Sequence, residues 1–510
     1  MDVSASSALN GDRRRRELGA LFDGETVDVL VVGGGITGTG IALDAASRGL
    51  RVALVEKHDL AFGTSRWSSK LVHGGLRYLA SGNVAIAHES AVERGILMTR
   101  TAPHLVKPLP QVVPLVRGMP RSNSALVRAG FLAGDALRRA TGTPSSVLPN
   151  SRTIDPAAVI SEAPTVRRAG LRGGLMAWDG QLVDDARLVV AVARTAALYG
   201  AKILTGVSVS KADRTSATLT DVVTGSTTDV RARVVINAAG VWAGEVDPRI
   251  TLRPSRGTHL VFDASTFGGL SCSLTIPIPG ERNRFVFALP APLGRVYVGL
   301  TDEAADGPIP DVPRATDPEI EFLLDVLGTA VDPAPTLSDV VGAFAGLRPL
   351  LDSGSGVTAD VSRRHAVLDD GTGPIGVVGG KLTTYRRMAQ DAVDTAVAAT
   401  GQVAGPCITA SIPLVGALPP GFAVSASSTL ARRYGSEAAL VVALADGMPN
   451  GLAPIGDGID VCPAEFEFSV RYEGARSVAD LLDRRTRIGL VESDRERAVD
   501  AATRILTAQP

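Results

Sequence analysis

The feature that most constrains this chain is a glycine-rich turn that follows an apolar run near the start of its 510 residues. The run at 28–32 is rich in β-branched residues, which predicts a buried strand. Gly33, Gly35 and Gly38 then form a G-x-G-x-x-G pattern, and the Ala-rich sequence up to residue 48 predicts a helix. In such a turn the first glycine permits a sharp bend and the second lets a pyrophosphate approach the backbone. The third lets the helix pack close to the strand.

A second strand is predicted at 51–55, and it leads into Glu56. A carboxylate there accepts hydrogen bonds from an adenosine ribose and repels a 2′-phosphate. The N–H groups and dipole at the start of the intervening helix favour phosphate. Strand, turn, helix, strand and acid in this order predict a Rossmann-type dinucleotide site. The alternative is a glycine-rich turn in another α/β fold, and the motif leaves the identity of the dinucleotide open.

Composition and charge exclude several classes of partner. The formal net charge is −1 and aromatic residues make up 4% of the chain, so neither a basic field nor a stacking platform for nucleic acid is expected. Cys272, Cys407 and Cys462 lie far apart without C-x-x-C spacing. We therefore expect no metal site and no disulfide framework, which fits a reducing compartment.

No apolar run reaches the roughly 18 to 20 residues that a membrane-spanning helix needs. The arginines at 13–16 are followed by acidic residues and not by an apolar segment, so we predict no signal peptide. Residues 1–25 are predicted to form a partly disordered, partly helical extension. Its four arginines are either solvated or in contact with an anionic surface.

A loop rich in small and hydroxylated residues follows the first βαβ unit at 59–79. Small residues let backbone donors approach a ligand closely. Thr64 and Ser65 come soon after Glu56 and are predicted to bond the pyrophosphate. Arg77 and Tyr78 are predicted to reach an anionic substrate, and the alternative for Arg77 is a surface salt bridge.

The chain returns twice more from an apolar strand into a small-residue turn. The first return ends the predicted strands of 201–236 and enters the turn at 237–240. The second enters Gly379-Gly380 and a helix predicted at 383–400. Such returns are used by two-domain FAD enzymes, whose dinucleotide lies extended over the sheet. Between the two returns, strands alternate with Pro/Gly turns over 245–340, which predicts a mixed or antiparallel substrate domain.

Five stretches together resemble the FAD-dependent (respiratory) glycerol-3-phosphate dehydrogenase family, within the wider D-amino-acid-oxidase-like flavoproteins. They are SSKLVHGGLRYL at 68–79, VDDARL at 183–188, GTH at 257–259, GLRPL at 346–350 and GGKLTTYR at 379–386. They occur in the family's order, and the charged helical C-terminus is similar to the family's cap domain.

The resemblance implies an α/β fold with a Rossmann-like FAD-binding domain of the glutathione-reductase/D-amino-acid-oxidase type, a mixed or antiparallel β substrate domain and a helical C-terminal cap. We predict the following segments: an extension at 1–25, FAD-binding segments at 26–100, 170–244 and 341–402, substrate-binding segments at 101–169 and 245–340, and the cap at 403–510.

The implied reaction is oxidation of sn-glycerol 3-phosphate to dihydroxyacetone phosphate, with hydride passing to FAD and electrons to a membrane quinone. The resemblance also implies cytoplasmic localisation, with peripheral attachment to the inner face of the cell membrane. A homodimer is a candidate assembly. We expect FAD to be held without a covalent bond, because the sequence has no Cys or His of the family type for attachment.

The substrate carries a phosphate, which favours the planar donor fork of arginine. By resemblance we assign the phosphate to Arg348 and Arg363, with Arg77 and Tyr78 nearer the glycerol end. Arg364 adjoins Arg363, so the register there stays open between the two.

A base must take the proton of the C2 hydroxyl. Among the six histidines, His259 on a substrate-domain strand is our candidate, and the alternative is a core histidine. Lys381 is predicted to reach the flavin or polarise the substrate oxygen, the alternative being a structural ion pair. The predicted cofactor contacts are Gly33, Gly35, Gly38, Glu56, Thr64, Ser65, Ser69, Lys381, Leu382 and Thr383.

Three alternatives remain at this stage. The first is a glycerol-3-phosphate oxidase that uses O2, and the second is an amino-acid oxidase of the same fold. The third is a flavoprotein scaffold without catalytic activity.

Overall fold

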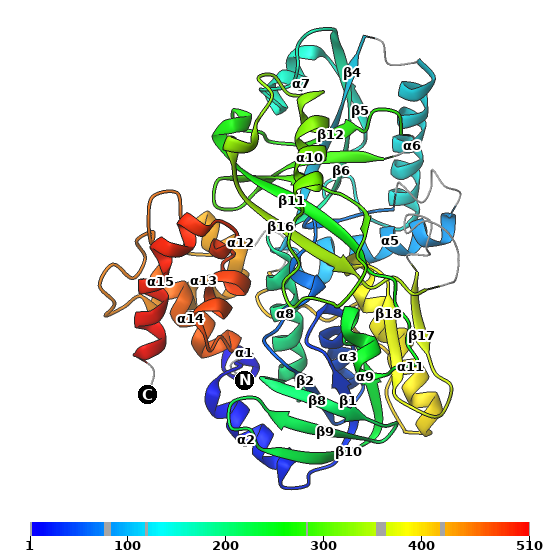
Figure 1. Ribbon diagram of the computed structural model, residues 1–510, viewed down its shortest axis with the longest axis vertical. Helices are drawn as coiled ribbons and strands as arrows, with labels where there is room; N and C mark the ends of the chain where they lie inside the picture. The colour runs from blue at the N-terminus through cyan, green and yellow to red at the C-terminus, as the bar shows by residue number, and fades with distance from the viewer. Residues whose placement is uncertain are drawn as a thin grey trace.

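The computed structural model describes residues 3–75, 83–117, 121–281, 284–352, 364–418 and 424–508, apart from the side chains of 121–124. Two large sheets form the body of the molecule, and a group of C-terminal helices lies at its side (Figure 1). This arrangement confirms the predicted fold class, a Rossmann-like domain joined to a mixed β domain and a helical C-terminal domain.

The first sheet carries the glycine-rich turn. Its strand order is β17-β18-β10-β1-β2-β7, formed by His365–Leu368, Ile375–Gly379, Thr227–Asn237, Val27–Val32, Val52–Glu56 and Lys202–Thr205. β1 pairs in parallel with both β10 and β2, so the turns that follow β1 and β10 emerge at the same edge. The two chain returns predicted from the sequence therefore meet the first glycine turn.

Both faces of this sheet are covered, which explains why β1 is an uninterrupted apolar run. Val29 and Val31 join the core beneath α3 (Ile36–Ser47), α8 (Asp185–Leu198) and α11 (Tyr385–Thr400). Leu30 and Val32 face the other way, toward α2 (Gly11–Phe22) and the hairpin of β8 (Val207–Ala212) and β9 (Ser216–Asp221).

The second sheet has the order β15-β11-β14-β13-β12-β4-β6-β3, with β16 paired to β11 and β5 to β6. These strands are Glu303–Ala304, Ser255–Asp263, Arg295–Gly299, Phe285–Ala291, Ser273–Pro277, Val106–Val116, Leu171–Leu182, Leu71–Val72, Val340–Arg348 and Arg152–Ile154. Helices α7 (Pro156–Glu162) and α10 (Asp317–Gly328) contribute to its core. One pair, β12 with β4, is parallel, so the sheet is mixed.

Sheet membership differs from the predicted segments at three strands. β3, β6 and β16 lie within the segments predicted for FAD binding, yet all three pair in the second sheet. The sequence also leaves β4 unpredicted, because Pro108, Pro110 and Pro114 interrupt its apolar run. Prolines at alternate positions lack N–H groups on one side of a strand only, and β12 pairs with just Gln111 and Val112 of β4. On the other side β4 pairs with β6 from Val106 to Val116, with one register shift between Leu115 and Val116.

The N-terminal residues correct another expectation. Residues 3–7 and 11–22 form helices α1 (Val3–Ser7) and α2 in place of a partly disordered extension. Arg13 donates to the carbonyls of Ala197 and Ala201, and Arg14 donates to the carbonyl of Thr205 and pairs with Asp221. Two of the four arginines are thus bound to the protein itself, because backbone carbonyls at the end of α8 and along β7 and the residue before it accept from them.

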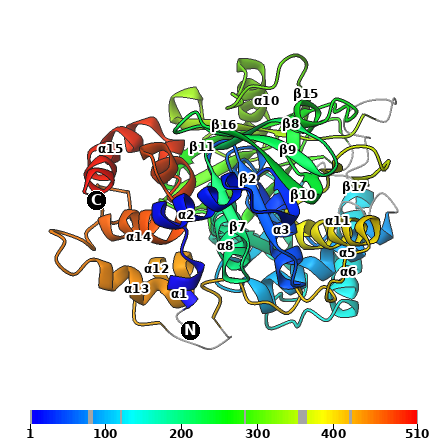
Figure 2. The same cartoon turned by 90° about the horizontal axis from the view of Figure 1, so that it is seen from below.

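The C-terminal domain contains α12 (Ser428–Tyr434), α13 (Ala438–Leu444), α14 (Pro463–Glu473) and α15 (Glu492–Thr507). It has two small apolar cores, one of which also includes Leu293 from the turn between β13 and β14. From below it lies beside α1 and α2 (Figure 2). The remaining α-helices of the described residues are α5 (Val84–Ile96), α6 (Arg121–Ala140) and α9 (Ala243–Val246).

Candidate active site

The predicted dinucleotide turn has the geometry that its glycines indicate. Gly33 adopts φ +112°, and a Cβ there would lie 2.5 Å from the carbonyl oxygen of Ala238. A Cβ at Gly38 would collide with the carbonyl of Gly33, so only glycine lets α3 approach β1 this closely. Gly35 is the N-cap of α3 and lines the cavity together with Ile36 and Thr37, the first two residues of the helix.

Glu56 ends β2 at the cavity wall, as predicted. Its carboxylate accepts from the backbone N–H groups of Gly34 at 2.7 Å and His58 at 2.8 Å. Burial raises the pKa of Glu56, and these two N–H groups oppose the rise. The two N–H contacts hold the side chain at the mouth of the glycine turn, where a ribose would have to lie.

Thr64 and Ser65 both line the cavity, but their hydroxyl groups are engaged differently. Ser65 Oγ accepts from the N–H of Ile36 at 2.9 Å and keeps its own proton for donation. Thr64 Oγ1 donates its proton to the carbonyl of Leu347 at 2.7 Å, so it ties the loop to β16. The geometry therefore suits Ser65 as a phosphate donor better than Thr64.

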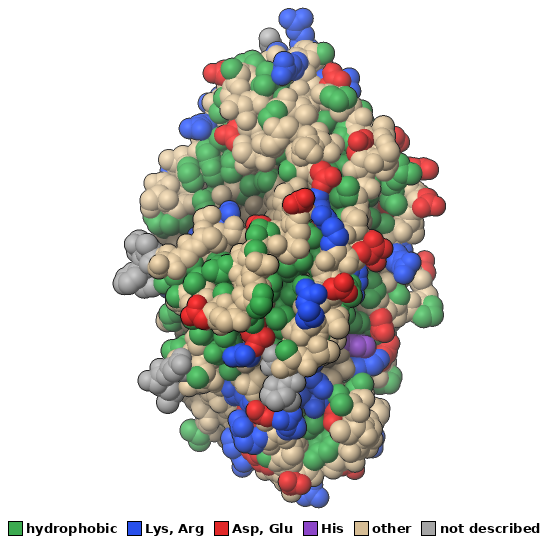
Figure 3. Space-filling view, turned by 90° about the vertical axis from the view of Figure 1, so that its left-hand side faces the viewer, with side chains coloured by type: hydrophobic (Ala, Val, Ile, Leu, Met, Phe, Trp, Pro, Cys, Tyr) green, Lys and Arg blue, Asp and Glu red, His purple; other side chains and the backbone are tan. Residues whose placement is uncertain are grey.

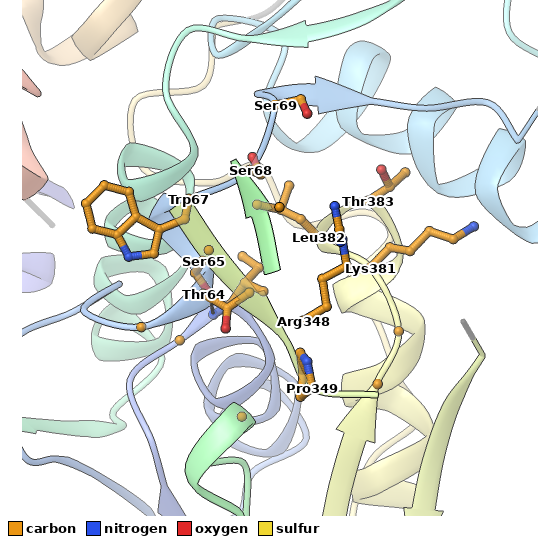
Figure 4. Close-up of a pocket in the computed structure, with 18 of the residues that line it drawn as sticks. Thr64, Ser65, Trp67, Ser68, Ser69, Arg348, Pro349, Lys381, Leu382 and Thr383 are labelled. Carbon is orange, nitrogen blue, oxygen red and sulfur yellow. Dashed lines mark hydrogen bonds between the residues drawn. The ribbon is translucent and has the colours of Figure 1, made fainter. Parts of the chain in front are cut away.

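The second return of the chain brings Gly379 and Gly380 to the same cavity. Both have positive φ, and a Cβ at Gly379 would lie 2.7 Å from the carbonyl oxygen of Arg364. Leu382 and Thr383 follow in a short 3-10 turn that leads into α11, and both line the cavity. The side chain of Lys381 points away from Arg348, and its Nζ donates to Ser90 Oγ of α5 at 3.0 Å (Figure 4).

One continuous cavity of about 1000 Å³ joins these turns to the second sheet. It extends from the glycine turn past Ser65 and Trp67 to His259 and Arg348. A cavity of this size and reach accommodates an extended dinucleotide together with a small substrate.

His259 lies on β11 at the wall of this cavity and is 2% exposed. Its Nε2 lies 2.8 Å from Ser69 Oγ, and its ring stacks on Phe344 with 4.7 Å between centroids. Burial lowers the pKa of His259 well below its usual value, and the nearby charges of Lys70 and Arg348 lower it further. The imidazole is therefore neutral near pH 7. Nδ1 is buried without a hydrogen-bond partner in the described part of the chain.

The loop that presents Ser69 is anchored by a buried ion pair that sequence reasoning missed. Lys70 Nζ donates to Asp185 Oδ2 at 2.9 Å and to the carbonyls of Arg66 and Ser68. Asp185 also accepts from the backbone N–H and hydroxyl of Ser68. Burial lowers the pKa of Lys70 to about 8, against the opposing charge of Asp185. Both residues lie in the stretches that carry the family resemblance, which was the available signal.

Arg348 ends β16, and its guanidinium reaches the cavity (Figure 4). It donates to Asp302 Oδ1 and Ser255 Oγ, both at 2.9 Å. A Cβ at Gly257 would collide with this guanidinium, and a Cβ at Gly299 would collide with the ring of His259. Gly257, Gly299 and Asp302 thus shape the site, and of these only Gly257 belongs to a stretch that carries the family resemblance.

Three predicted substrate residues, Arg77, Tyr78 and Arg363, lie outside the described residues. Arg364, the alternative to Arg363, lies next to β17, and its carbonyl packs against Gly379. The structure therefore brings together His259, Arg348, Ser69 and the glycine turns.

Comparison with known proteins agrees with this arrangement. Residues 28–385 match the family described as FAD dependent oxidoreductase, and residues 378–509 match the C-terminal domain of alpha-glycerophosphate oxidase. The chain is 61% identical to glycerol-3-phosphate dehydrogenase 1 of Mycobacterium tuberculosis over 98% of its own length and 99% of that relative.

The chain belongs to the FAD-dependent glycerol-3-phosphate dehydrogenase family.

Solved structures of similar fold include a glycerol-3-phosphate dehydrogenase from Bacillus halodurans complexed with FAD. It is 27% identical, has a TM-score of 0.74 and aligns with 98% of this chain and 94% of its own. The L-alpha-glycerophosphate oxidase of Mycoplasma pneumoniae, with FAD bound, shares the fold at 18% identity and a TM-score of 0.58, over 76% of this chain and 99% of its own.

This member of the glycerol-3-phosphate dehydrogenase family is therefore an FAD-dependent oxidoreductase. Its residues fit the cofactor on their own geometry. The glycine turn leaves no room for a Cβ at Gly33 or Gly38, the first residues of α3 line the cavity, and Glu56 and Ser65 offer an acceptor and a donor. Gly379 to Thr383 would border the opposite end of the bound group.

Proposed function

We propose that this protein oxidises sn-glycerol 3-phosphate to dihydroxyacetone phosphate and passes the electrons to a membrane quinone. The observation that carries the substrate assignment is the position of His259 and Arg348 on the paired strands β11 and β16, facing one cavity. The names of the relatives, at 61% and 27% identity, support the same substrate.

FAD, when bound, supplies the group that accepts the hydride from C2. The chain must then supply a proton acceptor for the C2 hydroxyl, and the neutral imidazole of His259 is in the form that accepts one. Ser69 holds the ring through Nε2, and Phe344 stacks on its face, so the ring has a fixed orientation.

The substrate phosphate needs a cation that is already oriented. Arg348 meets this requirement because Asp302 and Ser255 hold its guanidinium at the cavity wall. Asp302 also reduces the positive potential there, so a second cation is expected. By resemblance, Arg77 and Arg363 are the candidates, with Tyr78 near the glycerol end.

In this proposal Lys381 holds the Gly379–Gly380 turn in position. Its backbone lies at the Gly379–Gly380 turn, while its amine bonds Ser90 of α5. The amine links the turn to α5, the helix that follows the segment containing Arg77 and Tyr78.

The test is anaerobic addition of sn-glycerol 3-phosphate to the purified holoenzyme. We expect the visible absorbance of oxidised flavin to disappear, with one equivalent of dihydroxyacetone phosphate formed. Retention of the absorbance with glycerol 3-phosphate, together with its loss on adding an amino acid, would overturn the substrate assignment. Retention with both would favour the non-catalytic scaffold.

A second candidate, an oxidase that uses O2, is favoured by the match of residues 378–509 to a domain of alpha-glycerophosphate oxidase. Stopped-flow mixing of the reduced enzyme with air or with a soluble quinone separates the two. The quinone proposal expects faster reoxidation by the quinone. Rapid peroxide formation in air without quinone would replace it with the oxidase.

Use of a membrane quinone requires contact with a bilayer, so we also propose peripheral attachment at the cytoplasmic face of the membrane. None of the helices in the described ranges is long and apolar enough to cross a bilayer. A homodimer remains a proposal for the assembly.

A further inference from the structure

A second cavity lies between α2, the turn that joins β9 to β10, and Arg476, which follows α14. Its volume is about 400 Å³, which suits one small ligand. None of the described residues that line it also lines the cavity that contains His259 and Arg348. In the view from below, α2 lies between the C-terminal helices and the strands of the first sheet (Figure 2). Three parts of the chain thus meet around a space that the proposed function leaves unused.

The α2 side of this cavity is a single helix face that changes from basic to apolar. Its residues recur at helical spacing, and they are Gly11, Arg14, Arg15, Leu18, Gly19 and Phe22. Leu18 and Phe22 also pack into the core beside the first sheet. Val223 of the turn is 63% exposed and adds a third apolar side chain to the lining. A Cβ at Gly19 would meet no neighbouring atom within 4 Å, so the apolar end of the cavity is open.

Two guanidinium groups converge beside Gly206. A Cβ on this glycine would lie 3.1 Å from Arg476 Nη1 and 3.4 Å from Arg14 Nη2, so the two like charges are close neighbours. Arg14 is balanced, because it donates to two backbone carbonyls and pairs with Asp221. The guanidinium of Arg476 has no hydrogen bond or ion pair among the described residues, although its own backbone N–H donates to Asp480. Like charges repel, so an anion between these two groups would stabilise the arrangement.

The arginine run at 13–16 supplies a further cation to this cavity. Arg15 lines it and is exposed, and its partner Asp12 is exposed as well. A surface pair of this kind contributes little, so it leaves Arg15 able to turn toward a bound anion. Arg16 is also exposed but lies outside the lining. The described residues of the lining include three arginines and one acid, Asp221. Basic side chains gather in the lower part of the face shown in Figure 3, at the height of α2 in Figure 1.

We propose that this cavity binds a mononucleotide, with the phosphate at Arg14 and Arg476 and the base over the open face at Gly19. The planar donor fork of arginine matches phosphate oxygens, and two such forks already meet at one place. A flat base covers the apolar surface of Leu18 and Phe22. Inorganic phosphate would leave that surface uncovered, and an uncharged apolar ligand would leave Arg476 without an acceptor. The site depends neither on the proposed substrate nor on the electron acceptor.

The experiment is isothermal titration calorimetry of the FAD-loaded protein with AMP, adenosine and inorganic phosphate. We expect a single saturable AMP site per chain, with affinity about tenfold or more above that for adenosine or phosphate. Added salt should weaken AMP binding, because part of the contact is ionic. AMP should also raise the thermal midpoint, since it binds the folded junction of three parts of the chain. Flavin absorbance of an ultrafiltrate, measured in parallel, reports whether FAD stays bound.

Two substitutions test the two ends of the site while the fold is kept. Arg476→Gln removes a guanidinium that has no partner among the described residues, and Gly19→Leu fills open space with a better helix former. Each should weaken AMP binding about tenfold or more, while the thermal midpoint without AMP is unchanged or higher. The matched control is Arg16→Gln, which removes a charge next to Arg15 but outside the lining. It should bind AMP as the wild type does.

Absence of saturable AMP binding would overturn the proposal, and so would binding that survives in both Arg476→Gln and Gly19→Leu. Release of flavin as AMP binds would place the nucleotide in the FAD site instead. Phosphate that binds as tightly as AMP would reduce the cavity to a site for an inorganic anion, and an equal loss of binding in Arg16→Gln would indicate general charge attraction. Failure of glycerol 3-phosphate to reduce the flavin would overturn the proposed function and leave this site standing, because the described linings of the two cavities share no residue.

Discussion

His259 shows how burial sets the chemistry of a single side chain. A histidine in water is partly protonated near pH 6.5, but here the ring lies between β14 and β16 with Gly299 beneath it. Burial and two nearby cations remove the proton, and Ser69 fixes the orientation through Nε2. From the sequence alone, His259 was the candidate base, with an inert core histidine as the alternative.

Replacing this ring tests its role as the base. His259→Asn should lower the rate of flavin reduction roughly 10²- to 10⁴-fold, because a positioned base contributes that much, while KM changes little. Single-turnover stopped-flow absorbance measures it. Ser69→Ala is the companion variant, and we expect a smaller loss because only the orientation of the ring is relaxed. A normal rate in His259→Asn would remove the residue from this role.

The lowered pKa of His259 makes a prediction about pH. The ring is already neutral at pH 7.5 and stays neutral as the pH falls through 6.5, so flavin reduction at saturating substrate should not decline there on account of His259. The pH profile of single-turnover reduction reports groups in the enzyme–substrate complex. An inflection near pH 6.5 that disappears in His259→Asn would contradict the neutral assignment.

Arg348 is the residue to test for phosphate binding. Arg348→Ala should remove a charge-assisted contact worth roughly 1.5–3 kcal/mol, which raises KM roughly 10- to 150-fold. Arg348→Lys keeps the charge but loses the planar donor fork, so its KM should lie between those of the wild type and Arg348→Ala. Steady-state kinetics with a soluble acceptor measure both. An unchanged KM in Arg348→Ala would refute the phosphate assignment.

At the scale of elements, strand pairing and one loop assemble the site. β16 pairs with β11 and thereby places Arg348 opposite Ser255, while the loop after β2 crosses from the first sheet to the second and carries Ser65 and Ser69. The Lys70–Asp185 pair fastens this loop to the start of α8. A loop that joins two sheets needs such an anchor, because its small and hydroxylated residues provide little apolar packing.

Breaking this anchor should affect stability and catalysis together. Lys70→Met leaves the buried Asp185 carboxylate without its cation, which costs about 3–5 kcal/mol. We expect a lower thermal midpoint and slower flavin reduction, since Ser69 loses its fixed position. The double variant Lys70→Met/Asp185→Leu removes the stranded charge and should recover part of the midpoint. The midpoints are compared by thermal melting, with flavin fluorescence as the signal. A Lys70→Met midpoint equal to that of the wild type would show that the Lys70–Asp185 pair does not anchor the loop.

At the scale of the whole molecule, buried arginines of the C-terminal domain hold it to the FAD domain. Arg485 donates to both carboxylate oxygens of Asp59 at 2.8 and 2.9 Å, and Arg484 donates to the same carboxylate at 2.7 Å. Arg187 of α8 reaches Glu473 in the opposite direction. Each pair is almost fully buried, so removing one partner is costly although the pair as such adds little net stability.

The pH dependence of this contact follows from Asp59. Burial alone would raise the pKa of Asp59, but Arg485 and Arg484 outweigh it and hold the pKa below its usual value. The carboxylate therefore stabilises the fold above about pH 4, and this contribution is lost as the pH falls through the lowered pKa. Arg485→Met should lower the thermal midpoint strongly at pH 7 and progressively less in acid. Arg15→Met, which breaks an ion pair with Asp12 that is exposed on both sides, is the control and should change the midpoint little. An equal loss by Arg485→Met at pH 7 and in acid would contradict the assignment.

The sequence alone determined the features that depend on residues close together in the chain. The βαβ unit with Gly33, Gly38 and Glu56 was predicted correctly, because backbone conformation and close approach at a glycine turn are set within a few residues. The helices that follow the glycine turns at 33–38 and 379–380 were predicted for the same reason, and the family resemblance identified the cofactor through short motifs. His259 and Arg348 were named from such motifs, without their surroundings.

Only the tertiary structure decided which distant groups meet. It brought Ser69 to His259, Asp302 to Arg348 and Asp185 to Lys70, and it placed β16 in the second sheet. It also packed the N-terminal arginines onto carbonyls that lie nearly two hundred residues away along the chain. These contacts depend on strand order and on the burial of charge, and neither leaves a periodic signal in the sequence. The opening glycine motif is thus a local property of the chain, and the active site at the far end of its cavity is a property of the fold.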